Sequence, residues 1–169
     1  DGSANRMARA QANLSRLGLT ADLVTADVTE WAPERTFDAV LLDAPCTATG
    51  TIRRHPDILH LKRSTDLEKL AELQRRLLSS AARHVAPGGV LVYCTCSLEP
   101  EEGPAQVEAF LAGHPEFARQ PIAPGEAGIS AECLTAAGDL RTLPFHSPAG
   151  DSGDRGMDGF YAARLLRTS

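Results

Sequence analysis

The sequence predicts a three-layer α/β fold, in which helices pack on both faces of a mainly parallel sheet. Helical patterns over residues 3–17, 65–85 and 100–111 alternate with apolar runs of strand length. Two such runs, 37–42 and 90–95, are typical of buried strands, and a last pair of runs closes the chain as a hairpin. Helices that alternate with parallel-type strands and end in a hairpin favour this fold class.

The first helix is predicted from Ser3, a residue that caps helix N-termini, to about Leu17. Apolar residues recur along it at three- and four-residue spacing, and Gly18 provides the C-terminal stop. A short strand over residues 22–26 is predicted next, and it ends at Asp27.

The second strand covers residues 37–42. The loop 44–63 that follows contains glycine and proline and is too long for a simple connection, so we expect it to be functional. Thr65 and Glu68 form a capping-box pattern at the start of a long helix that continues to about Val85.

The remaining elements are, in chain order, a turn at Pro87-Gly88-Gly89, a strand over 90–95, a helix from Pro100 to about Leu111, and strands over 140–145 and 160–166. The loop His146 to Asp158 is rich in Gly, Ser, Asp and Pro, and we expect it to form a mobile flap. No internal repeat and no second domain is visible, so residues 1–169 are interpreted as one domain.

The composition is that of an ordinary globular protein, with 169 residues, 43% of them hydrophobic and 23% charged. No run approaches the roughly 18 apolar residues that cross a bilayer, and no signal peptide leads the chain. Four cysteines without an export signal favour free thiols over a disulfide framework. We therefore expect a cytoplasmic protein without a membrane partner.

Two cysteines, Cys46 and Cys96, follow the ends of apolar strands. Ligands of open α/β sheets bind beyond the carboxyl ends of the strands, so both thiols are candidate nucleophiles at one pocket. Pro45 fixes the backbone before the first thiol, and the hydroxyls of Thr95 and Ser97 can donate to a thiolate at Cys96.

Two alternatives are open for these cysteines. A buried cysteine at a strand end is often only a small apolar residue, and Cys94, inside its strand, fits that interpretation. A zinc site built from Cys46, Cys94, Cys96 and Cys133 lacks the usual ligand spacing, so no metal is expected.

Three aspartates, Asp1, Asp27 and Asp43, lie at or beside successive predicted strand ends. In a Rossmann-like sheet an acid after the second strand holds ribose hydroxyls, and acids after the next strands lie along the same rim. A single aspartate there is common in turns and caps. Three in succession predict a nucleoside cofactor.

The net charge of −5 is unevenly distributed. Residues 53–84 carry eight Lys or Arg against four Asp or Glu, whereas the segments on either side are acidic. Much of this basic band is consistent with a solvated helix face. Arg53, Arg54 and His55 differ, because they directly follow the strand end at Asp43 to Cys46, and we expect them to contact RNA phosphates.

Two motifs then match a known family. The segments Asp43-Ala44-Pro45-Cys46-Thr47-Ala48-Thr49-Gly50 and Thr95-Cys96-Ser97 resemble the signature motifs of the S-adenosylmethionine-dependent RNA cytosine-C5 methyltransferases. The extension Ile52-Arg53-Arg54-His55-Pro56-Asp57-Ile58 resembles the bacterial 16S ribosomal RNA enzymes of the RsmB (Sun/Fmu) type. Pro100-Glu101-Glu102 and Asp158-Gly159-Phe160-Tyr161 are also similar, so the resemblance covers nearly the whole chain.

The resemblance implies a Rossmann-like class I methyltransferase fold, S-adenosylmethionine as cofactor and ribosomal RNA as partner. It implies that Cys96 is the nucleophile that adds to cytosine C6 and that Cys46 assists release of the product. It further implies that Asp43 contacts the target base near the cofactor, that Asp27 faces the adenine, and that Asp1 faces the ribose.

The sequence departs from this family in ways that matter for the cofactor. The first strand and the glycine-rich cofactor loop, which the family places just before Asp1, are missing, so we expect a truncated catalytic domain that binds S-adenosylmethionine poorly. Gly103 stands where the family usually has Asn. A non-catalytic α/β module that binds RNA or a protein is the alternative interpretation.

Overall fold

The computed structural model describes residues 1–61, 63–146 and 156–169, and most of the predicted flap 146–158 lies outside them. The chain divides into two compact units, Asp1–Arg35 and Thr36–Ser169. No helix in the described parts of the chain is long and apolar enough to cross a membrane.

The first unit contains the predicted helix, α1 (Ala4–Leu17). The Ser3 hydroxyl oxygen accepts a hydrogen bond from the Arg6 backbone N–H at 3.4 Å. Gly18 follows in the left-handed conformation, with φ of 67°, and its N–H bonds back to the last turn. Both predicted caps are confirmed.

The strand predicted over residues 22–26 is wrong, because these residues form no sheet ladder. Their backbone bonds instead to one residue of the same unit: the Asp1 amino group donates to Val24 O at 3.3 Å, and Ala26 N donates to Asp1 O at 3.2 Å. A strand needs a run of partner residues along its edge, and a single partner supplies only one such bridge.

The second unit contains a five-stranded sheet with the order β1-β2-β5-β3, in which β4 also pairs with β5. The strands are β1 (Phe37–Asp43), β2 (Val85–Thr95), β3 (Phe117–Arg119), β4 (Leu140–Thr142) and β5 (Phe160–Arg167). β1 and β2 are parallel, and β5 is antiparallel to β2, β3 and β4. The mixed sheet with its helices agrees with the predicted Rossmann-like fold.

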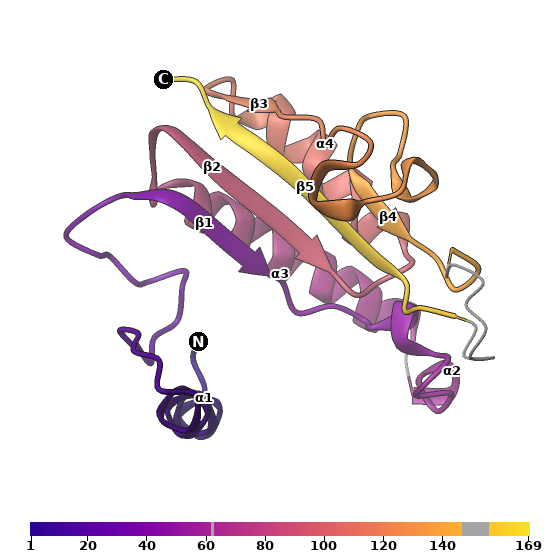
Figure 1. The fold of residues 1–169 in the computed structure, drawn as a ribbon, viewed down its shortest axis with the longest axis horizontal. Helices are drawn as coiled ribbons and strands as arrows, with labels where there is room; N and C mark the ends of the chain where they lie inside the picture. The colour runs from indigo at the N-terminus through magenta and orange to yellow at the C-terminus, as the bar shows by residue number, and fades with distance from the viewer. Residues whose placement is uncertain (62, 147–155) are drawn as a thin grey trace. The chain divides into compact units, whose positions relative to one another are not determined.

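The helices of this unit are α2 (Ile58–Leu61), α3 (Ser64–Ala82) and α4 (Pro104–Gly113). Short 3₁₀ turns cover Thr49–Thr51, Pro100–Glu102, Glu126–Gly128 and Ala131–Cys133. α3 packs against β1 and β2, α4 packs against α3 and β3, and Figure 1 shows both helices on the same face of the sheet.

The start of α3 differs from the predicted capping box. The helix begins at Ser64, and the Asp66 carboxylate accepts from the Arg63 backbone N–H at 3.1 Å, so Thr65 and Glu68 are not the capping pair. The helix ends at Ala82, before Val85, because Val85 already pairs with Phe37 in the sheet.

The predicted turn at residues 87–89 is a local irregularity inside β2. Phe37 pairs with Val85 and Ala39 pairs with Val90, so the segment between the two β2 residues is an insertion in the ladder. Gly88 has a φ of 77°, which a residue with a Cβ rarely adopts. Regular pairing then runs from Val90 to Cys94.

The helix predicted from Pro100 is interrupted at Gly103, whose φ and ψ of −122° and −108° are not helical. α4 begins only at Pro104, which needs no hydrogen-bond acceptor for its nitrogen at this first position. The strand predicted to reach Phe145 ends at Thr142, and Pro144 follows, which has no N–H for a ladder. The pairing of β4 with β5 confirms the hairpin.

The core lies between the sheet and the two helices. Leu78, Leu91, Tyr93, Val107 and Leu165 are among its fully or nearly fully buried members. Val40 and Leu42 of β1 pack against this core, whereas Leu41 points to the other face and is 69% exposed within the described chain. Apolar residues on both faces of a strand are typical of a sheet covered on both sides.

We predict that Gly50→Ala strongly destabilises the protein. Gly50 N donates to Cys96 O at 3.0 Å and Gly50 O accepts from Gly159 N at 2.8 Å, so three backbone segments meet there. A Cβ at Gly50 would lie 2.0 Å from Gly159 O. We expect a loss of at least about 2 kcal/mol in the free energy of unfolding, measured by urea denaturation.

Gly113→Ala is the matched control, because a Cβ there meets nothing within 4 Å. It should leave the unfolding midpoint unchanged or raise it. Equal midpoints for the two variants would contradict the close packing at Gly50.

Candidate functional site

The carboxyl ends of β1 and β2 lie side by side and bring the two cysteine segments together. Asp43 pairs with Cys94 in the parallel ladder, and Ala44 N donates to Cys94 O at 3.0 Å. Beyond this point the sulfur atoms of Cys46 and Cys96 lie 3.4 Å apart. Both side chains are half-buried and both cysteines are free. The two predicted thiols therefore lie in direct contact at one site.

The two thiols differ in acidity. A hydrogen bond from the Cys46 thiol to Cys96 lowers the pKa of Cys96 from 9.0 to about 7, against the opposing effects of burial and of the Asp43 charge. The same hydrogen bond raises the pKa of Cys46, and burial raises it further. The pair therefore loses its first proton near pH 7, and the hydrogen bond favours the state with a thiolate at Cys96 and a thiol at Cys46.

The predicted hydroxyl donors to Cys96 are wrong. The Thr95 hydroxyl donates to Glu102 O at 3.3 Å, and the Ser97 hydroxyl lies 3.3 Å from that of Thr47 and 3.2 Å from that of Thr49. Ser97 is fully buried. These hydroxyls join the two motif segments to each other and to the core, and the stabilising donor to the thiolate is Cys46.

Asp43 and Cys94 occupy the strand ends next to the thiols. The Asp43 side chain is exposed, and the buried Cys94 thiol donates weakly to it at 3.8 Å. Burial and the Asp43 charge raise the pKa of Cys94 to about 12. Cys94 therefore remains a protonated thiol, in agreement with its interpretation as a packing residue.

Asp1 and Asp27 belong to the unit 1–35, whereas Asp43 belongs to the unit 36–169. Asp1 Oδ1 accepts from Ser3 N at 2.8 Å, and Asp27 Oδ1 accepts from the backbone and the hydroxyl of Thr29. All three aspartates are exposed. Exposed carboxylates can accept from hydroxyl or amino groups, so the residues fit a nucleoside cofactor in their chemistry.

A buried carboxylate, Glu102, holds the segment that carries Cys46. Its two oxygens each lie 3.0 Å from Thr47 N, and one accepts from the Thr47 hydroxyl at 2.5 Å. The Gln74 side-chain amide donates to Glu102 at 3.0 Å and to Pro45 O at 2.8 Å. Neither residue has a local sequence signal for this role, because Glu102 lies 55 positions from Thr47 and Gln74 lies 29 positions from Pro45.

Arg141 holds the segment after Cys96 from the other side. Its guanidinium donates to Ser97 O at 3.1 Å and to Leu98 O at 2.7 Å, from strand β4. The sequence around Arg141, in a short strand next to the predicted flap, does not indicate this contact. Both cysteine segments are therefore anchored by side chains from distant elements.

The predicted RNA-contacting residues lie on the turn that follows the 3₁₀ turn Thr49–Thr51, and two of them already have a protein partner. Arg54 Nε donates to Asp158 Oδ2 at 2.7 Å, and the nearest Arg53 nitrogen lies 3.6 Å from Asp158 Oδ1. The Arg54 guanidinium lowers the pKa of the Asp158 carboxyl. His55 is exposed.

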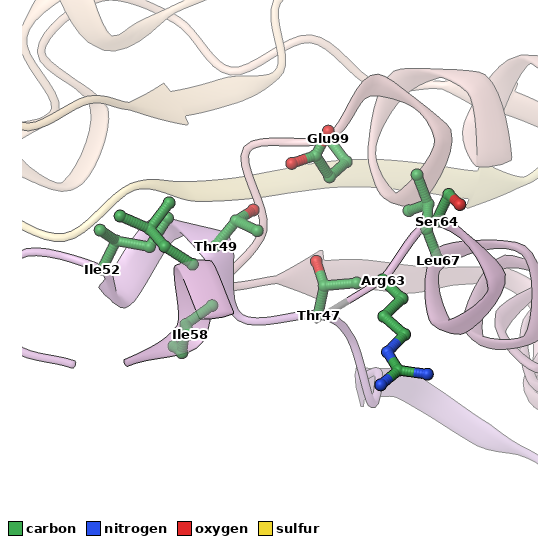
Figure 2. Close-up of a pocket in the computed structure, with 9 residues that line it drawn as sticks. Thr47, Thr49, Ile52, Ile58, Arg63, Ser64, Leu67 and Glu99 are labelled. Atoms are coloured by element: carbon green, nitrogen blue, oxygen red, sulfur yellow. The ribbon is translucent and has the colours of Figure 1, made fainter. Parts of the chain in front are cut away.

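A cavity of about 280 Å³ opens beside the Cys46 segment. Figure 2 shows that it lies between the 3₁₀ turn at Thr49, helix α2 and the start of α3. Its walls are apolar at Ile52, Ile58 and Leu67, and Figure 2 shows Arg63 and Glu99 on opposite sides of it. Apolar walls with a few polar groups are typical of small-molecule sites.

Cys133 is buried in the 3₁₀ turn Ala131–Cys133, which is distant in sequence from the other three cysteines. Within residues 1–61, 63–146 and 156–169, no cluster of three or more His, Cys, Asp or Glu side chains is arranged to hold a metal ion. Within the unit 36–169, the candidate site thus consists of the Cys46–Cys96 thiol pair, the exposed Asp43 carboxylate and a cationic rim formed by Arg53 and Arg54.

Comparisons with known proteins identify the family of the chain. The model of the 16S rRNA methyltransferase RsmB/F family matches residues 1–166. Ribosomal RNA small subunit methyltransferase B of Shewanella oneidensis is 40% identical over 178 residues, which covers 100% of this chain and 37% of that protein. The chain therefore spans little more than a third of the length of this curated relative.

Two solved structures are also similar. NSun6 from Pyrococcus horikoshii with SFG has a TM-score of 0.77 and 27% identity, over 100% of this chain and 40% of that one. A methyltransferase homolog protein from the same organism has a TM-score of 0.71 and 30% identity, over 99% of this chain and 52% of that one. The chain belongs to the RsmB/F family of 16S rRNA methyltransferases and has the class I methyltransferase fold.

Proposed function

We propose that this chain is the partial catalytic domain of an enzyme that methylates cytosine C5 in 16S ribosomal RNA, with S-adenosylmethionine as the methyl donor. The observation that carries the proposal is the thiol pair, in which the sulfur atoms of Cys46 and Cys96 lie within hydrogen-bond distance, 3.4 Å apart. Membership of the RsmB/F family supports the RNA substrate and the cofactor.

Cys96 is the nucleophile. C5 of a pyrimidine is unreactive toward a methyl group until a nucleophile adds to C6 and pushes electron density onto C5. A thiolate is needed for that addition, and the lowered pKa of Cys96, about 7, supplies one at neutral pH. Bond formation between Sγ and C6 transfers the negative charge of the thiolate to the ring, where it makes C5 nucleophilic.

Cys46 assists release. The hydrogen bond to Cys96 is the main reason why the pKa of Cys46 is high. This interaction is lost once the sulfur of Cys96 is bonded to carbon. Cys46 then becomes more acidic, gives its own proton to water and, as a thiolate, can accept the proton from C5. Loss of that proton returns the electron pair to the ring, and the bond between C6 and the sulfur of Cys96 breaks.

Asp43, Asp1 and Asp27 are the proposed cofactor residues. Asp43 lies at the end of β1 beside the thiols, where its carboxylate can accept from the exocyclic amine of cytosine as well. Asp27 would accept from the adenine amine and Asp1 from the ribose hydroxyls. S-adenosylmethionine, when bound, supplies the methyl group that C5 accepts.

The substrate cytosine must be unpaired or displaced from its stack, because a thiol cannot reach C6 inside a helix. Arg53, Arg54 and His55 are the proposed phosphate contacts. The chain as a whole is acidic, with a net charge of −5, so tight binding to ribosomal RNA needs further contacts beyond this rim. We place the reaction in the cytoplasm, where ribosomal RNA is modified in bacteria.

We predict that Cys46→Ala in the full-length protein accumulates a covalent RNA adduct in the presence of S-adenosylmethionine and ribosomal RNA. The attacking thiol remains, while the group that assists release is gone. The adduct is measured as a slowly migrating band on a denaturing gel. Cys133→Ala, which removes a buried thiol elsewhere, is the control and should form no stable adduct.

The double variant Cys46→Ala/Cys96→Ala should form no adduct. An adduct that persists without Cys96 would exclude it as the nucleophile. RNA binding without any adduct in Cys46→Ala would favour the non-catalytic module instead.

We predict that iodoacetamide alkylates Cys96 with a midpoint near pH 7, where the Cys96 pKa lies. Thiolate alone reacts, so the rate rises as pH passes upward through this value. Removing the donor by Cys46→Ala should move the midpoint upward, toward the ordinary value of 9.0, and slow the reaction at pH 7 several-fold. Mass spectrometry of the Cys96 peptide gives the rate; a midpoint that stays near 7 in Cys46→Ala would show that another group lowers it.

We predict that Arg53→Gln weakens RNA binding about equally for all sequences and reduces the slope of log affinity against log salt by about 1, as expected for one phosphate contact. Arg53 pairs only loosely with Asp158, so its charge is available. Arg75→Gln removes an exposed arginine of α3 that pairs with Glu72, and it serves as the control. Filter binding at several salt concentrations measures both, and equal slopes would exclude the contact.

A further inference from the structure

We propose that Glu102 and Gln74 are positioning residues that hold the Cys46 thiol against Cys96, and that this contact depends on them. The inference deepens the proposed function and rests on it, since it assigns how the thiol pair is assembled. It concerns two buried polar residues of α3 and of the 3₁₀ turn after β2, which take no part in the chemistry themselves.

The chain is fixed directly after Cys46. The backbone N–H of Thr47 lies 3.0 Å from both oxygens of Glu102, and the Thr47 hydroxyl donates to one of them at 2.5 Å. Glu102 is 0% exposed and Thr47 is 3% exposed, so water does not compete for these bonds. The peptide on this side of the thiol therefore has one well-determined position.

The chain is also fixed directly before Cys46. The Gln74 amide donates to Pro45 O at 2.8 Å and to Glu102 at 3.0 Å, and its own oxygen accepts from the Tyr93 hydroxyl at 3.3 Å. Gln74 is 0% exposed. Both peptide neighbours of Cys46 are thus held by one connected pair of side chains.

Glu102 is itself held at its backbone. Its carbonyl oxygen accepts from the Tyr93 hydroxyl at 2.8 Å and from the Thr95 hydroxyl at 3.3 Å, one residue before Cys96. Gly103 follows, and a Cβ there would lie 3.2 Å from the Tyr161 ring. The carboxylate therefore connects the Cys46 segment to the strand that carries Cys96.

A carboxylate is the required group at this position. Three donors converge on its two oxygens, and a buried charge is tolerated only when such bonds saturate it. Glutamine at 102 has the same shape but offers one oxygen and one NH₂. Its NH₂ would face a donor of Thr47 or Gln74, so the Cys46 segment would shift.

A positioning role and a purely electrostatic role of Glu102 predict opposite effects on Cys96. The charge of Glu102 raises the pKa of Cys96, so removing the charge alone would lower that pKa. The hydrogen bond from Cys46 lowers the pKa of Cys96 and is the largest influence on it, so losing this contact would raise the pKa. The direction of the shift in a Glu102→Gln variant therefore distinguishes the two roles.

The test is the pH dependence of iodoacetamide alkylation of the Cys96 peptide in the full-length protein, without RNA or cofactor. Glu102→Gln is compared with Glu101→Gln, which removes the same charge from an exposed neighbour. We expect the Cys96 midpoint to rise in Glu102→Gln and the rate at pH 7 to fall at least about fivefold, while Glu101→Gln stays like the wild type. A midpoint that falls, or stays unchanged, overturns the proposal.

Thr47→Val and Thr47→Ser provide a second pair in case Glu102→Gln does not fold. Valine keeps the volume and the net charge but removes the hydroxyl bond to Glu102, whereas serine retains it. We expect a raised Cys96 midpoint in Thr47→Val and a normal one in Thr47→Ser; equal midpoints overturn the proposal. This assay needs no methyl transfer, so a failure of the proposed function, seen as no adduct in Cys46→Ala, remains a separate result.

Discussion

The parallel pairing of β1 with β2 is the constraint on which the site depends. Its register sets Asp43 beside Cys94, and the residues that follow each strand then meet at the same edge of the sheet. A shift of the register by one residue would turn every side chain of β1 to the opposite face. Leu42 would then leave the core and Leu41 would enter it, so packing against α3 fixes the place at which the thiols meet.

The asymmetry of the thiol pair follows from this proximity. Two equivalent cysteines at 3.4 Å share one hydrogen bond, and whichever sulfur accepts it becomes the more acidic. Burial raises the pKa of both, but Cys46 is the more deeply enclosed, between Pro45 and Thr47, which are both fixed. The protein thus obtains a nucleophile and a proton carrier from the same residue type.

Much of the fold and the central residues of the site could be predicted from the sequence, because their signals are local. Ser3 and Gly18 mark the ends of α1, and the apolar runs before Asp43 and Cys96 mark the strand ends. The strand predicted over 22–26 failed because strand formation depends on a partner that no local pattern reveals.

Gln74 and Glu102, which hold the Cys46 segment in place, could not be predicted for a related reason. Gln74 lies in the middle of an amphipathic helix, where a glutamine is expected to be solvent-exposed, yet it is completely buried. Glu102 follows another glutamate, and no local pattern distinguishes the buried Glu102 from the exposed Glu101. The expected hydroxyl partners of Cys96 were wrong because Thr95 and Ser97, its direct neighbours in the chain, bond to Glu102 O and to the motif threonines.

The cationic rim is connected to the nucleophile by the chain between them. Gly50 bonds to Cys96 O and to Gly159, and Arg54, a few residues on, pairs with Asp158 next to Gly159. The charge of Cys96 also raises the pKa of Arg54, so the guanidinium lies within electrostatic reach of the thiolate. A phosphate offers the same paired oxygen acceptors as the Asp158 carboxylate, and the Arg54–Asp158 pair is exposed and weakened by salt. A phosphate is therefore a chemically equivalent partner for the Arg54 guanidinium.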